Sequence, residues 1–423
     1  MSDKKNVPKI RFPGFTEPWE QRKLEDIYGS IGNAFVGTAT PYYVESGHFY
    51  LESNNIKDGQ INHNTEVFIN DEFYEKQKDK WLHTGDMVMV QSGHVGHAAV
   101  IPEELNNSAA HALIMFRNPK KEIEPYFLNY QYQTLKSKKK IENITTGNTI
   151  KHILASEMQQ FEVDMPELAE QKKIAEYFRA LDHLITLHQR KLEHVKKMKK
   201  SMLQKMFPKK NQLYPEVRFP GFTDAWEQRK LGELVKEGLL EAPLDGNHGE
   251  KHPTSDEYVD SGIPFLMASD IHNGEVNIYS CKYITKERAE RLDKGFARNG
   301  DVLLTHKATI GETAILSNLM TEYAMLTPQV TYYRIKNEER LNREYLYSFF
   351  NSLDFQTELK TKAAQSTRPY IGITAQQNLK IILPAEIDEQ IRIGLYFRNL
   401  DHLITLHQRE SIFAFILKNI THL

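Results

Sequence analysis

Two polar segments, placed alike in the two halves of the chain, carry side chains that could hydrogen-bond to a nucleic acid. Glutamine can bind adenine through two hydrogen bonds, serine and threonine can reach a base edge, and glycine lets the backbone approach a phosphate closely. We therefore predict DNA contacts at Gln91, Ser92, Gly93, His94 and Gly96 in the first half, and at Thr305, His306, Lys307, Thr309 and Gly311 in the second. The alternative is a pair of plain strand-to-strand turns whose polar side chains face solvent.

A second pair of polar segments, at residues 146–152 and 365–370, precedes a helical pattern in each half. Asn148 and Lys151 belong to the first segment, and Thr367 and Arg368 belong to the second. Arg368 could bind guanine bidentately or hold a phosphate, because a guanidinium presents several donors in a planar fork. A capping loop that merely begins the next helix is the competing interpretation.

Catalytic patterns are sparse in this sequence. The phosphate-binding pattern GxxxxGKS/T is absent, and so is an Asn-Pro-Pro-Tyr type motif of an amino-methyltransferase. Asp245 and Glu250 are the nearest candidates for the carboxylate cluster of a metal-dependent nuclease, and the first half has no equivalent. His94 and His97 resemble half of a zinc pattern without further ligands nearby, so we interpret them as loop histidines. We predict no catalytic residue and no metal site.

The elements that must position these segments are built twice. Residues 11–24, RFPGFTEPWEQRKL, recur as RFPGFTDAWEQRKL at 218–231, and YFRALDHLITLHQR at 177–190 recurs as YFRNLDHLITLHQR at 396–409. Between these blocks most residues differ, yet the apolar runs and several glycines keep a constant spacing of 215 residues, as Gly96 and Gly311 do. The sequence therefore predicts one α+β fold made twice, with a different set of polar side chains on each copy.

The second repeated block lies in a long helical pattern with apolar residues at steps of three and four. From Gln171 to Met206 this seam spans 36 residues, or roughly 54 Å of helix, and it stops before Pro208. Such a long amphipathic helix needs a partner helix, which the second copy supplies from Ile393 onwards. The seam residues that we expect to lie in helical contacts are Phe178, Leu181, Ile185 and Leu192, and Phe397, Leu400 and Ile404.

Two features of these helices are unusual. Each seam contains one histidine, His188 in the first and His407 in the second. We interpret each as a polar residue that fixes the helix register, in preference to a metal or catalytic site. After Arg409 the second copy no longer resembles the first and lacks its basic residues. The apolar stripe predicted for this tail consists of Ile412, Ile416, Ile420 and Leu423.

The composition bounds the remaining possibilities. The formal net charge is −2 over 423 residues, so any nucleic-acid binding must use local basic clusters such as the lysines at 136–140. The single cysteine, Cys281, excludes a disulfide framework and agrees with a reducing compartment. No secretory signal and no run of about 18 apolar residues is present, so we expect a cytoplasmic protein.

The paired PGF–W–EQRKL openings, the EQ-containing helix starts and the LDHLITLHQR helices resemble the specificity (S) subunit of type I restriction-modification enzymes. The resemblance covers essentially the whole chain. It implies two tandem target recognition domains, each a mixed sheet with helices, at residues 1–165 and 211–384. It also implies two long antiparallel coiled-coil-like helices, a central one at 166–210 and a distal one at 385–423, related by a pseudo-two-fold internal repeat.

The resemblance further implies a function without catalysis by this chain. Each recognition domain would read one half of a bipartite DNA target, and the helices would set the gap between the halves. The seam residues of the helices would dock two methyltransferase (M) subunits, which use S-adenosylmethionine, and restriction (R) subunits, which use ATP and Mg, would join them. The chain itself would bind no cofactor. A coiled-coil adaptor without DNA specificity and a self-contained nuclease are the alternatives.

Overall fold

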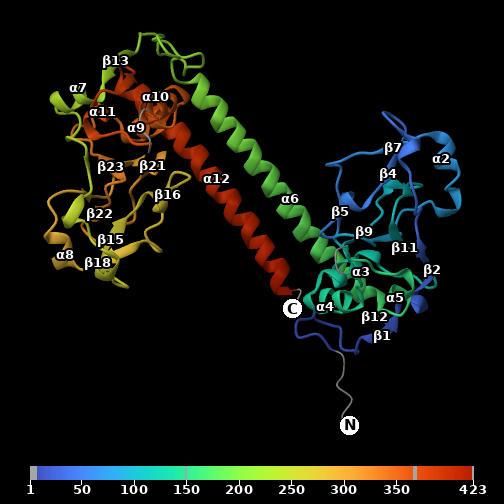
Figure 1. Cartoon of the computed structure of the whole chain (residues 1–423). Coiled ribbons are helices and arrows are strands. Elements are labelled where there is room, and N and C mark those ends of the chain that lie inside the picture. The colour runs from blue at the N-terminus through green and yellow to red at the C-terminus, as the bar shows by residue number, and fades with distance from the viewer. Residues whose placement is uncertain (1–6, 148–149, 365–368, 422–423) are drawn as a thin grey trace. The chain divides into compact units, whose positions relative to one another are not determined.

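The computed structural model of the chain describes residues 7–147, 150–364 and 369–421. The chain divides into a first unit, Met1–His188 with Glu410–Leu423, and a second unit, Gln189–Arg409. Two long helices, α6 (Leu168–Lys205) and α12 (Ile387–Thr421), each contribute residues to both units (Figure 1). The predicted helix at 171–206 is therefore confirmed, and it begins three residues earlier than expected.

The first unit contains two four-stranded sheets. One is antiparallel in the order β2–β11–β8–β9, and the other has the order β10–β4–β7–β3 with a parallel β10–β4 pair. All four residues of β8 are buried, which explains why this strand is a continuous apolar run. The strands of the first unit are β1 (Glu20–Lys23), β2 (Tyr28–Asn33), β3 (Tyr43–Val44), β4 (His48–Leu51), β5 (Ile56–Lys57), β6 (Gln60–Ile61), β7 (Phe68–Ile69), β8 (Met87–Val90), β9 (Ala98–Val100), β10 (Ala109–Ala110), β11 (Leu113–Pro119) and β12 (Glu162–Met165). Its short helices are α1 (Leu24–Ile27), α2 (Asp71–Glu75), α3 (Pro125–Gln133), α4 (Leu135–Ile144) and α5 (Ala155–Gln159).

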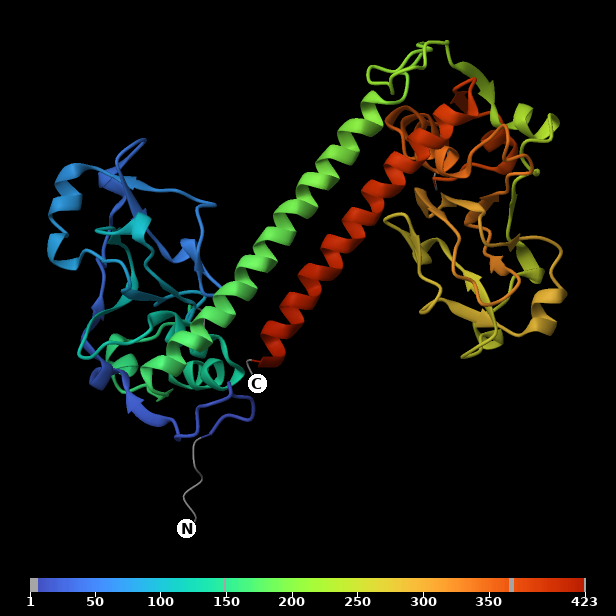
Figure 2. The same ribbon diagram turned by 180° about the vertical axis from the view of Figure 1, so that it is seen from behind.

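The second unit repeats this plan (Figure 2). Its four-stranded sheets have the orders β14–β23–β20–β21 and β18–β15–β22–β19. The strands are β13 (Glu227–Lys230), β14 (Leu244–Asp245), β15 (Ile263–Leu266), β16 (Ile271–His272), β17 (Glu275–Val276), β18 (Lys282–Ile284), β19 (Phe296–Ala297), β20 (Val302–Lys307), β21 (Thr309–Ile315), β22 (Ala324–Leu326), β23 (Val330–Tyr333) and β24 (Lys380–Leu383). The short helices are α7 (Leu231–Lys236), α8 (Lys286–Glu290), α9 (Arg343–Phe350), α10 (Leu353–Ala363) and α11 (Ile373–Gln377).

The two units have corresponding elements at the spacing that the sequence predicts. Strands β8 and β20 start 215 residues apart, and so do β4 and β15. Gly96 and Gly311 both adopt a positive φ, of 87° and 94°, which favours glycine. A Cβ atom at Gly96 would also lie 2.8 Å from the Ile141 side chain. The predicted duplication of one α+β fold is confirmed.

The repeated opening sequence of each half folds onto the start of a long helix. In the first unit, Arg11 Nε and Nη2 donate hydrogen bonds of 2.7 and 2.8 Å to Glu170, near the start of α6. Trp19 Nε1 donates to the same carboxylate at 3.2 Å. Strand β1 then pairs with β12, the strand that leads into α6. The Glu170 side chain has no exposed surface, so its charge is balanced inside the fold by Arg11.

The second unit contains the same arrangement. Arg218 donates hydrogen bonds of 2.6 and 2.8 Å to Glu389 of α12, and Trp226 donates one of 3.2 Å. The next residue is a glutamine in both helices: Gln171 accepts from the backbone of Glu124, and Gln390 accepts from that of Asn342 in α9's N-terminal cap. The shared Glu-Gln pair is thus explained by two sets of buried hydrogen bonds that fix each helix on its unit.

Each unit contains parts of α6 and α12 that run antiparallel. In the first unit, Asp182 and His188 of α6 lie 2.7 and 2.8 Å from Lys418 and Glu410 of α12, so residue numbers rise on one helix as they fall on the other. In the second unit, Lys199 of α6 binds Asp401 of α12 at 2.5 Å. Phe207, which follows α6, stacks on Phe397 with ring centroids 5.7 Å apart. The predicted antiparallel helical pair is confirmed within each unit.

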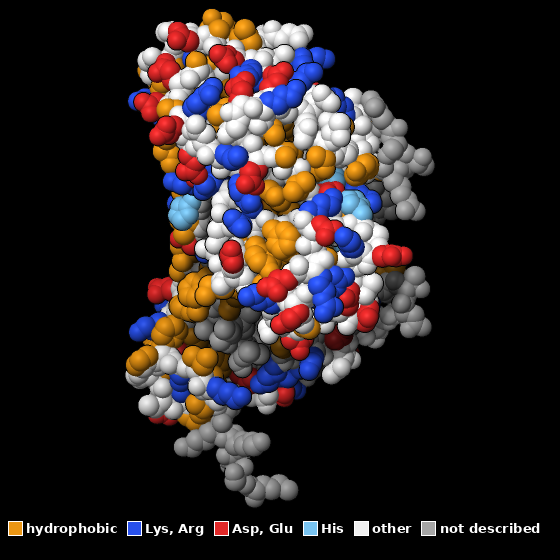
Figure 3. Space-filling view, turned by 90° about the vertical axis from the view of Figure 1, so that its left-hand side faces the viewer, with side chains coloured by type: hydrophobic (Ala, Val, Ile, Leu, Met, Phe, Trp, Pro, Cys, Tyr) orange, Lys and Arg blue, Asp and Glu red, His pale blue; other side chains and the backbone are white. Residues whose placement is uncertain are grey.

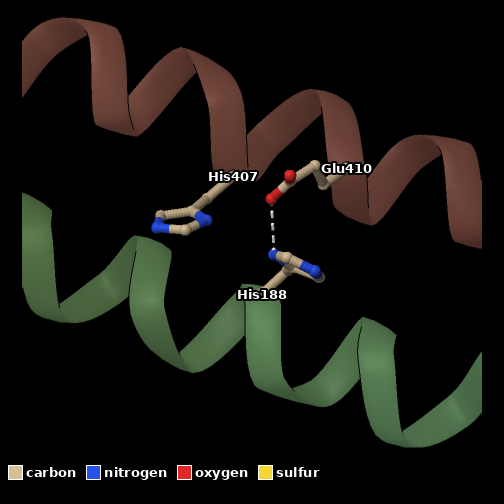
Figure 4. A group of neighbouring side chains, drawn as sticks. All are labelled: His188, His407 and Glu410. Carbon is tan, nitrogen blue, oxygen red and sulfur yellow. Dashed lines mark ion pairs between the residues drawn. The ribbon is translucent and has the colours of Figure 1, made fainter.

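The histidine of the α6 seam is half-buried and points to a carboxylate. His188 Nδ1 lies 2.8 Å from Glu410 Oε2 (Figure 4). The figure also draws His407, which precedes Glu410 by one turn on α12. A polar pair of this kind inside an apolar seam is suited to fix the register of two helices, and this role of His188 stays a prediction.

The stripe predicted for the tail of α12 is wrong. Ile412 and Ile416 are 58% and 46% exposed, whereas Ala414 is 5% exposed and Leu417 packs beside Tyr130 and its neighbours. Steps of three and four from Leu400 reach Ala414 and Leu417, so the seam continues unchanged and the new isoleucines fall on the outer face. The predicted residues Ile420 and Leu423 lie outside the side chains that the structure describes.

Candidate nucleic-acid interface

In the first unit, the two predicted polar segments lie side by side. Residues 91–97 form the loop of the β8–β9 hairpin. Gly93 N donates to Lys151 O at 3.0 Å, and Ile153 N donates to Gln91 O at 3.0 Å. Because these backbone bonds join the loop to residues 151–153, Gln91, Ser92, Gly93, His94, Gly96 and Lys151 belong to one surface region. Asn148 lies outside the described residues.

A cavity of about 520 Å³ opens beside this loop. Its lining combines cationic side chains, Lys138 and Lys151, with His94 and His97. His94 Nε2 lies 3.0 Å from Ser53 O, which holds the ring over the neighbouring segment. Burial lowers the pKa of His97. The nearby charges of His94 and Lys138 lower it further, whereas the charge of Asp58 opposes the shift. The cavity therefore presents donors and positive charge of the kind that bind phosphate and base edges.

Lys138 is a cationic residue of this cavity that was not among the predicted DNA contacts. It lies on α4, exposed, in the lysine run at 136–140. The run was visible in the sequence, but a solvated helix face explains such a run equally well. Only the fold shows that this lysine points to the same cavity as residues 93–97.

In the second unit the predicted loop is mostly strand. β20 continues to Lys307, the turn is at Ala308 with φ of 69°, and β21 begins at Thr309. Thr305 and His306 have no exposed surface, so the prediction that they contact DNA directly is wrong for this fold. The pairing of β20 with β21 shifts between Leu304 and His306, and this bulge keeps both polar side chains inside. Lys307 and Thr309 are exposed at the end of the hairpin, and Gly311 is half-buried behind them.

This hairpin also pairs with the second polar segment of its unit. Ile371 N donates to His306 O at 3.1 Å, and Lys307 forms a backbone bridge with Tyr370. The Lys307 ammonium lies 5.9 Å from the Tyr370 ring centroid. Lys307 also lines a cavity of about 330 Å³ together with His248, His252 and Gln329. Thr367 and Arg368, the other predicted contacts, lie outside the described residues.

His306 is a buried hydrogen-bonding residue. Its Nδ1 lies 3.0 Å from the carbonyl oxygen of Ile371. Burial lowers the pKa of His306 to about 4, although the neighbouring Asp245 and the Ile371 carbonyl oppose this shift. The ring is therefore neutral near pH 7, and it connects β20 to the segment that carries Tyr370.

The Asp245 carboxylate, which the nuclease alternative requires as a metal ligand, forms ion pairs with cationic side chains of the protein. Asp245 has a side chain that is 3% exposed, and it forms ion pairs with Lys294 and with His248, the latter at 2.9 Å. Burial raises its pKa, but the hydrogen bonds from Lys294 and His248 outweigh this effect, so the pKa is lowered overall. Glu250, its predicted partner, is exposed on a short 3-10 turn. This arrangement gives the nuclease alternative no support.

Most of the helix residues predicted to dock a partner pack in hydrophobic clusters within the chain. Phe178 and Leu181 are each 6% exposed in the first unit, and Phe397 and Leu400 are 0% and 4% exposed in the second. These side chains therefore lie in contacts within the chain, as expected for the helical seam, and the docking of a partner on these helices stays a prediction. Ile185, Leu192 and Ile404 are half-buried.

The surface carries a mixture of charges. On the face shown in Figure 3, lysine and arginine side chains are interspersed with aspartate and glutamate. This agrees with the net charge of −2 and means that binding to an anionic ligand depends on local groups such as those around residues 91–97. Within the part of the chain that the structure describes, no helix has the length and apolar character needed to cross a membrane.

Comparison with known proteins identifies the family. The family model described as type I restriction modification DNA specificity domain matches residues 16–197 and 223–412, one match in each copy of the repeat. The chain therefore belongs to this family, that of the specificity subunits of type I restriction-modification systems. The recognition made from the repeated sequence blocks is confirmed.

Similar proteins include the MjaVIII specificity subunit of Methanocaldococcus jannaschii, which is 23% identical over 96% of this chain and 91% of that protein. The EcoBI specificity subunit of Escherichia coli is 24% identical over 59% of this chain and 53% of that protein. Among solved structures, the type I restriction-modification S subunit from M. genitalium is similar with a TM-score of 0.59 and 13% identity, covering 98% of each chain. At this identity the structural match bears on the fold alone.

Proposed function

We propose that the chain reads a bipartite, asymmetric DNA sequence, with one half-site bound by each unit, and thereby directs adenine methylation or cleavage by partner subunits. In this proposal residues 1–165 and 211–384 are the two recognition domains. Residues 166–210 and 385–423 are the helices that set the spacing of the half-sites and join the domains to their partners.

One observation carries the proposal. Each unit presents a hairpin end that is hydrogen-bonded to a second polar segment, and the side chains at matched positions differ between the units. Ser92 corresponds to Lys307, and His94 corresponds to Thr309, at the common spacing of 215 residues. A shared frame with different hydrogen-bonding groups suits two readers of two different base sequences.

We assign the chemistry to partners. Two methyltransferase subunits would supply S-adenosylmethionine chemistry, and restriction subunits would use ATP and Mg. The chain itself would bind neither cofactor and would act by positioning these partners on DNA. Membership of the chain in the specificity-subunit family supports this proposed division of labour.

Binding of the purified chain to duplex DNA over a range of salt concentrations tests this proposal. A DNA reader is expected to bind with an affinity that falls steeply as salt rises, because lysines that contact phosphates release counterions. A protein adaptor without DNA specificity would show no such affinity. A nuclease would cleave the duplex when a divalent metal is added, and Asp245→Ala would abolish that cleavage. Absence of DNA binding at low salt would reject the proposal.

A further inference from the structure

A tight turn in each unit is attached to the strand that follows the polar hairpin loop. In the first unit this turn is at residues 58–59, between β5 and β6, with φ of 51° and 83°. In the second unit it is at residues 273–274, between β16 and β17, with φ of 55° and 81°. A backbone bridge joins each turn to the strand, at Ala99 in the first unit and at Ala314 in the second. The two turns are therefore equivalent parts of the repeated fold.

A different side chain binds the first residue of the turn in each unit. Asp58 N donates a hydrogen bond of 3.2 Å to His97 Nδ1. Asn273 N donates one of 3.3 Å to Glu312 Oε2. His97 and Glu312 are 215 positions apart, which is the spacing of the repeat. The fold therefore uses a hydrogen-bond acceptor at this position, and both imidazole and carboxylate can supply one.

This hydrogen bond determines which nitrogen of His97 carries the proton. A ring nitrogen that accepts a hydrogen bond has no proton, so in the neutral ring the proton lies on Nε2. Burial keeps the pKa of His97 below its usual value although the Asp58 carboxylate opposes the shift, so the ring is neutral near pH 7. No residue that the structure describes accepts a hydrogen bond from Nε2. His97 therefore offers one N–H donor.

Glu312 offers a group of the opposite polarity. A carboxylate has two acceptor oxygens and no donor. Asn273 binds Oε2, and within the described part of the chain the Glu312 side chain makes no other hydrogen bond. Oε1 is therefore available as an acceptor. Both side chains are partly exposed, that of His97 to 31%.

The surroundings of His97 suit a base edge. His97 lines the cavity of about 520 Å³ beside the β8–β9 loop, together with Lys138 and Lys151. Asp58 and Glu142 also line this cavity, so two lysines are balanced by two carboxylates. A phosphate alone would favour an excess of positive charge, whereas a base edge presents both donors and acceptors. The cavity therefore suits a base and its neighbouring phosphate better than a phosphate alone.

The bases differ in the group that they present in the major groove. Guanine and thymine carry an exocyclic oxygen there, which accepts hydrogen bonds. Adenine and cytosine carry an amino group there, which donates them. An N–H donor at the reading position consequently favours guanine or thymine, and a carboxylate oxygen at that position favours adenine or cytosine.

We propose that His97 and Glu312 are matched base-reading residues of opposite polarity. His97 selects guanine or thymine through Nε2–H in one half-site, and Glu312 selects adenine or cytosine through Oε1 in the other. This inference rests on the proposed function, because it requires that each unit reads one half-site. It adds a chemical preference at one position of each half-site. The fold requires only the acceptor that binds the turn, so the second polar atom of each side chain is left to contact the base.

Three substitutions test the inference, and each of them retains an acceptor for the turn. His97→Gln keeps a donor as well, because an amide has both an acceptor oxygen and a donor nitrogen. His97→Glu replaces that donor with an acceptor. Glu312→Gln makes the reverse change in the second unit. Wild-type and variant chains are expressed in cells with the partner methyltransferase, and methylated adenines are mapped.

The wild-type target is expected to be retained by His97→Gln. His97→Glu should replace guanine or thymine by adenine or cytosine at one position of one half-site. Glu312→Gln should replace adenine or cytosine by guanine or thymine at one position of the other half-site. In both cases methylation of the former target should fall at least about tenfold, since one wrong hydrogen-bonding group discriminates between bases to this extent.

Three results would overturn the inference while leaving the proposed function intact. They are a two-part target that His97→Glu leaves unchanged, a change at several positions, and the same change in His97→Gln as in His97→Glu. A wild-type chain without a two-part target would reject the proposed function and this inference with it.

A variant that gives no methylation is tested without its partner. The purified full chain, with its fold checked by circular dichroism, selects duplexes from a random-sequence pool. The expected result is the new base at one position of the selected duplexes. Selected duplexes with the wild-type preference, or with none, would also overturn the inference.

Discussion

The Arg11 guanidinium holds the fully buried Glu170 carboxylate through two hydrogen bonds, of 2.7 and 2.8 Å. These residues are 159 positions apart, so the pair ties the first residues of the unit to the start of α6. The repeated opening sequence is explained by this contact, since arginine and tryptophan of the opening both bind one glutamate of the helix.

Glu170→Gln is expected to destabilise the first unit, because it leaves the Arg11 charge buried without its counter-ion. The expected loss is about 3 kcal/mol in the free energy of unfolding. Urea denaturation followed by circular dichroism measures it, and Glu389→Gln is the matched change in the second unit. A loss below about 0.5 kcal/mol for Glu170→Gln would show that the pair does not hold the helix start.

The neutral, buried His306 is expected to make stability depend on pH. Its pKa is about 4 in the fold and about 6.5 in an unfolded chain, so the unfolded chain binds the extra proton between these values. Stability is therefore fully present above pH 6.5, falls as pH decreases, and has lost about 2 kcal/mol at pH 5 from this group. Urea midpoints at pH 7 and pH 5 measure the loss.

The replacement His306→Asn separates this effect from other titrating groups. The variant lacks the titratable ring, so the change in stability between pH 7 and pH 5 is expected to shrink by about 2 kcal/mol. An unchanged difference between the two pH values would mean that another group is responsible.

Lys151 and Lys307 are expected to contribute phosphate contacts on the two units. Each replacement by alanine should weaken DNA binding and reduce the slope of log affinity against log salt by about 0.9. Lys121→Ala, an exposed charge change that touches neither hairpin cavity, is the control. Equal effects of all three replacements would indicate non-specific charge attraction.

The helices are expected to set the gap between half-sites. Insertion of one heptad into both α6 and α12 preserves the seam and adds about 10 Å, close to three base pairs of DNA. Mapping methylated adenines should then show a gap lengthened by about three base pairs. Seven residues inserted at Met320, which is 96% exposed, should leave the gap unchanged. A constant gap in both variants would contradict a spacing role.

The sequence predicts the architecture of this protein well, because the sequence blocks that build it occur twice in the chain. The matched blocks around Trp19 and Trp226, and the helices that contain Glu170 and Glu389, could be aligned by inspection, and the structure shows the same hydrogen bonds in each. Repeats of this kind reveal architecture since each copy needs the same buried contacts.

The sequence was less informative about which polar residues reach the surface. Thr305 and His306 follow an apolar strand and therefore resemble the start of a loop, yet the strand continues and a bulge buries both. The apolar stripe predicted for the tail of α12 is wrong for a related reason, since Ile412 and Ile416 are apolar but lie off the helix seam. Local composition does not show the direction of a side chain; the continuous register of the element does.

Exchange of residues 35–165 for the same region of a relative tests the central claim, that each unit reads its own half-site. Methylated adenines are mapped in cells that carry the exchanged chain with its partner methyltransferase. The proposed division of labour predicts a new sequence in one half of the target, with the other half and the gap retained. A change in both halves, or in neither, would contradict it.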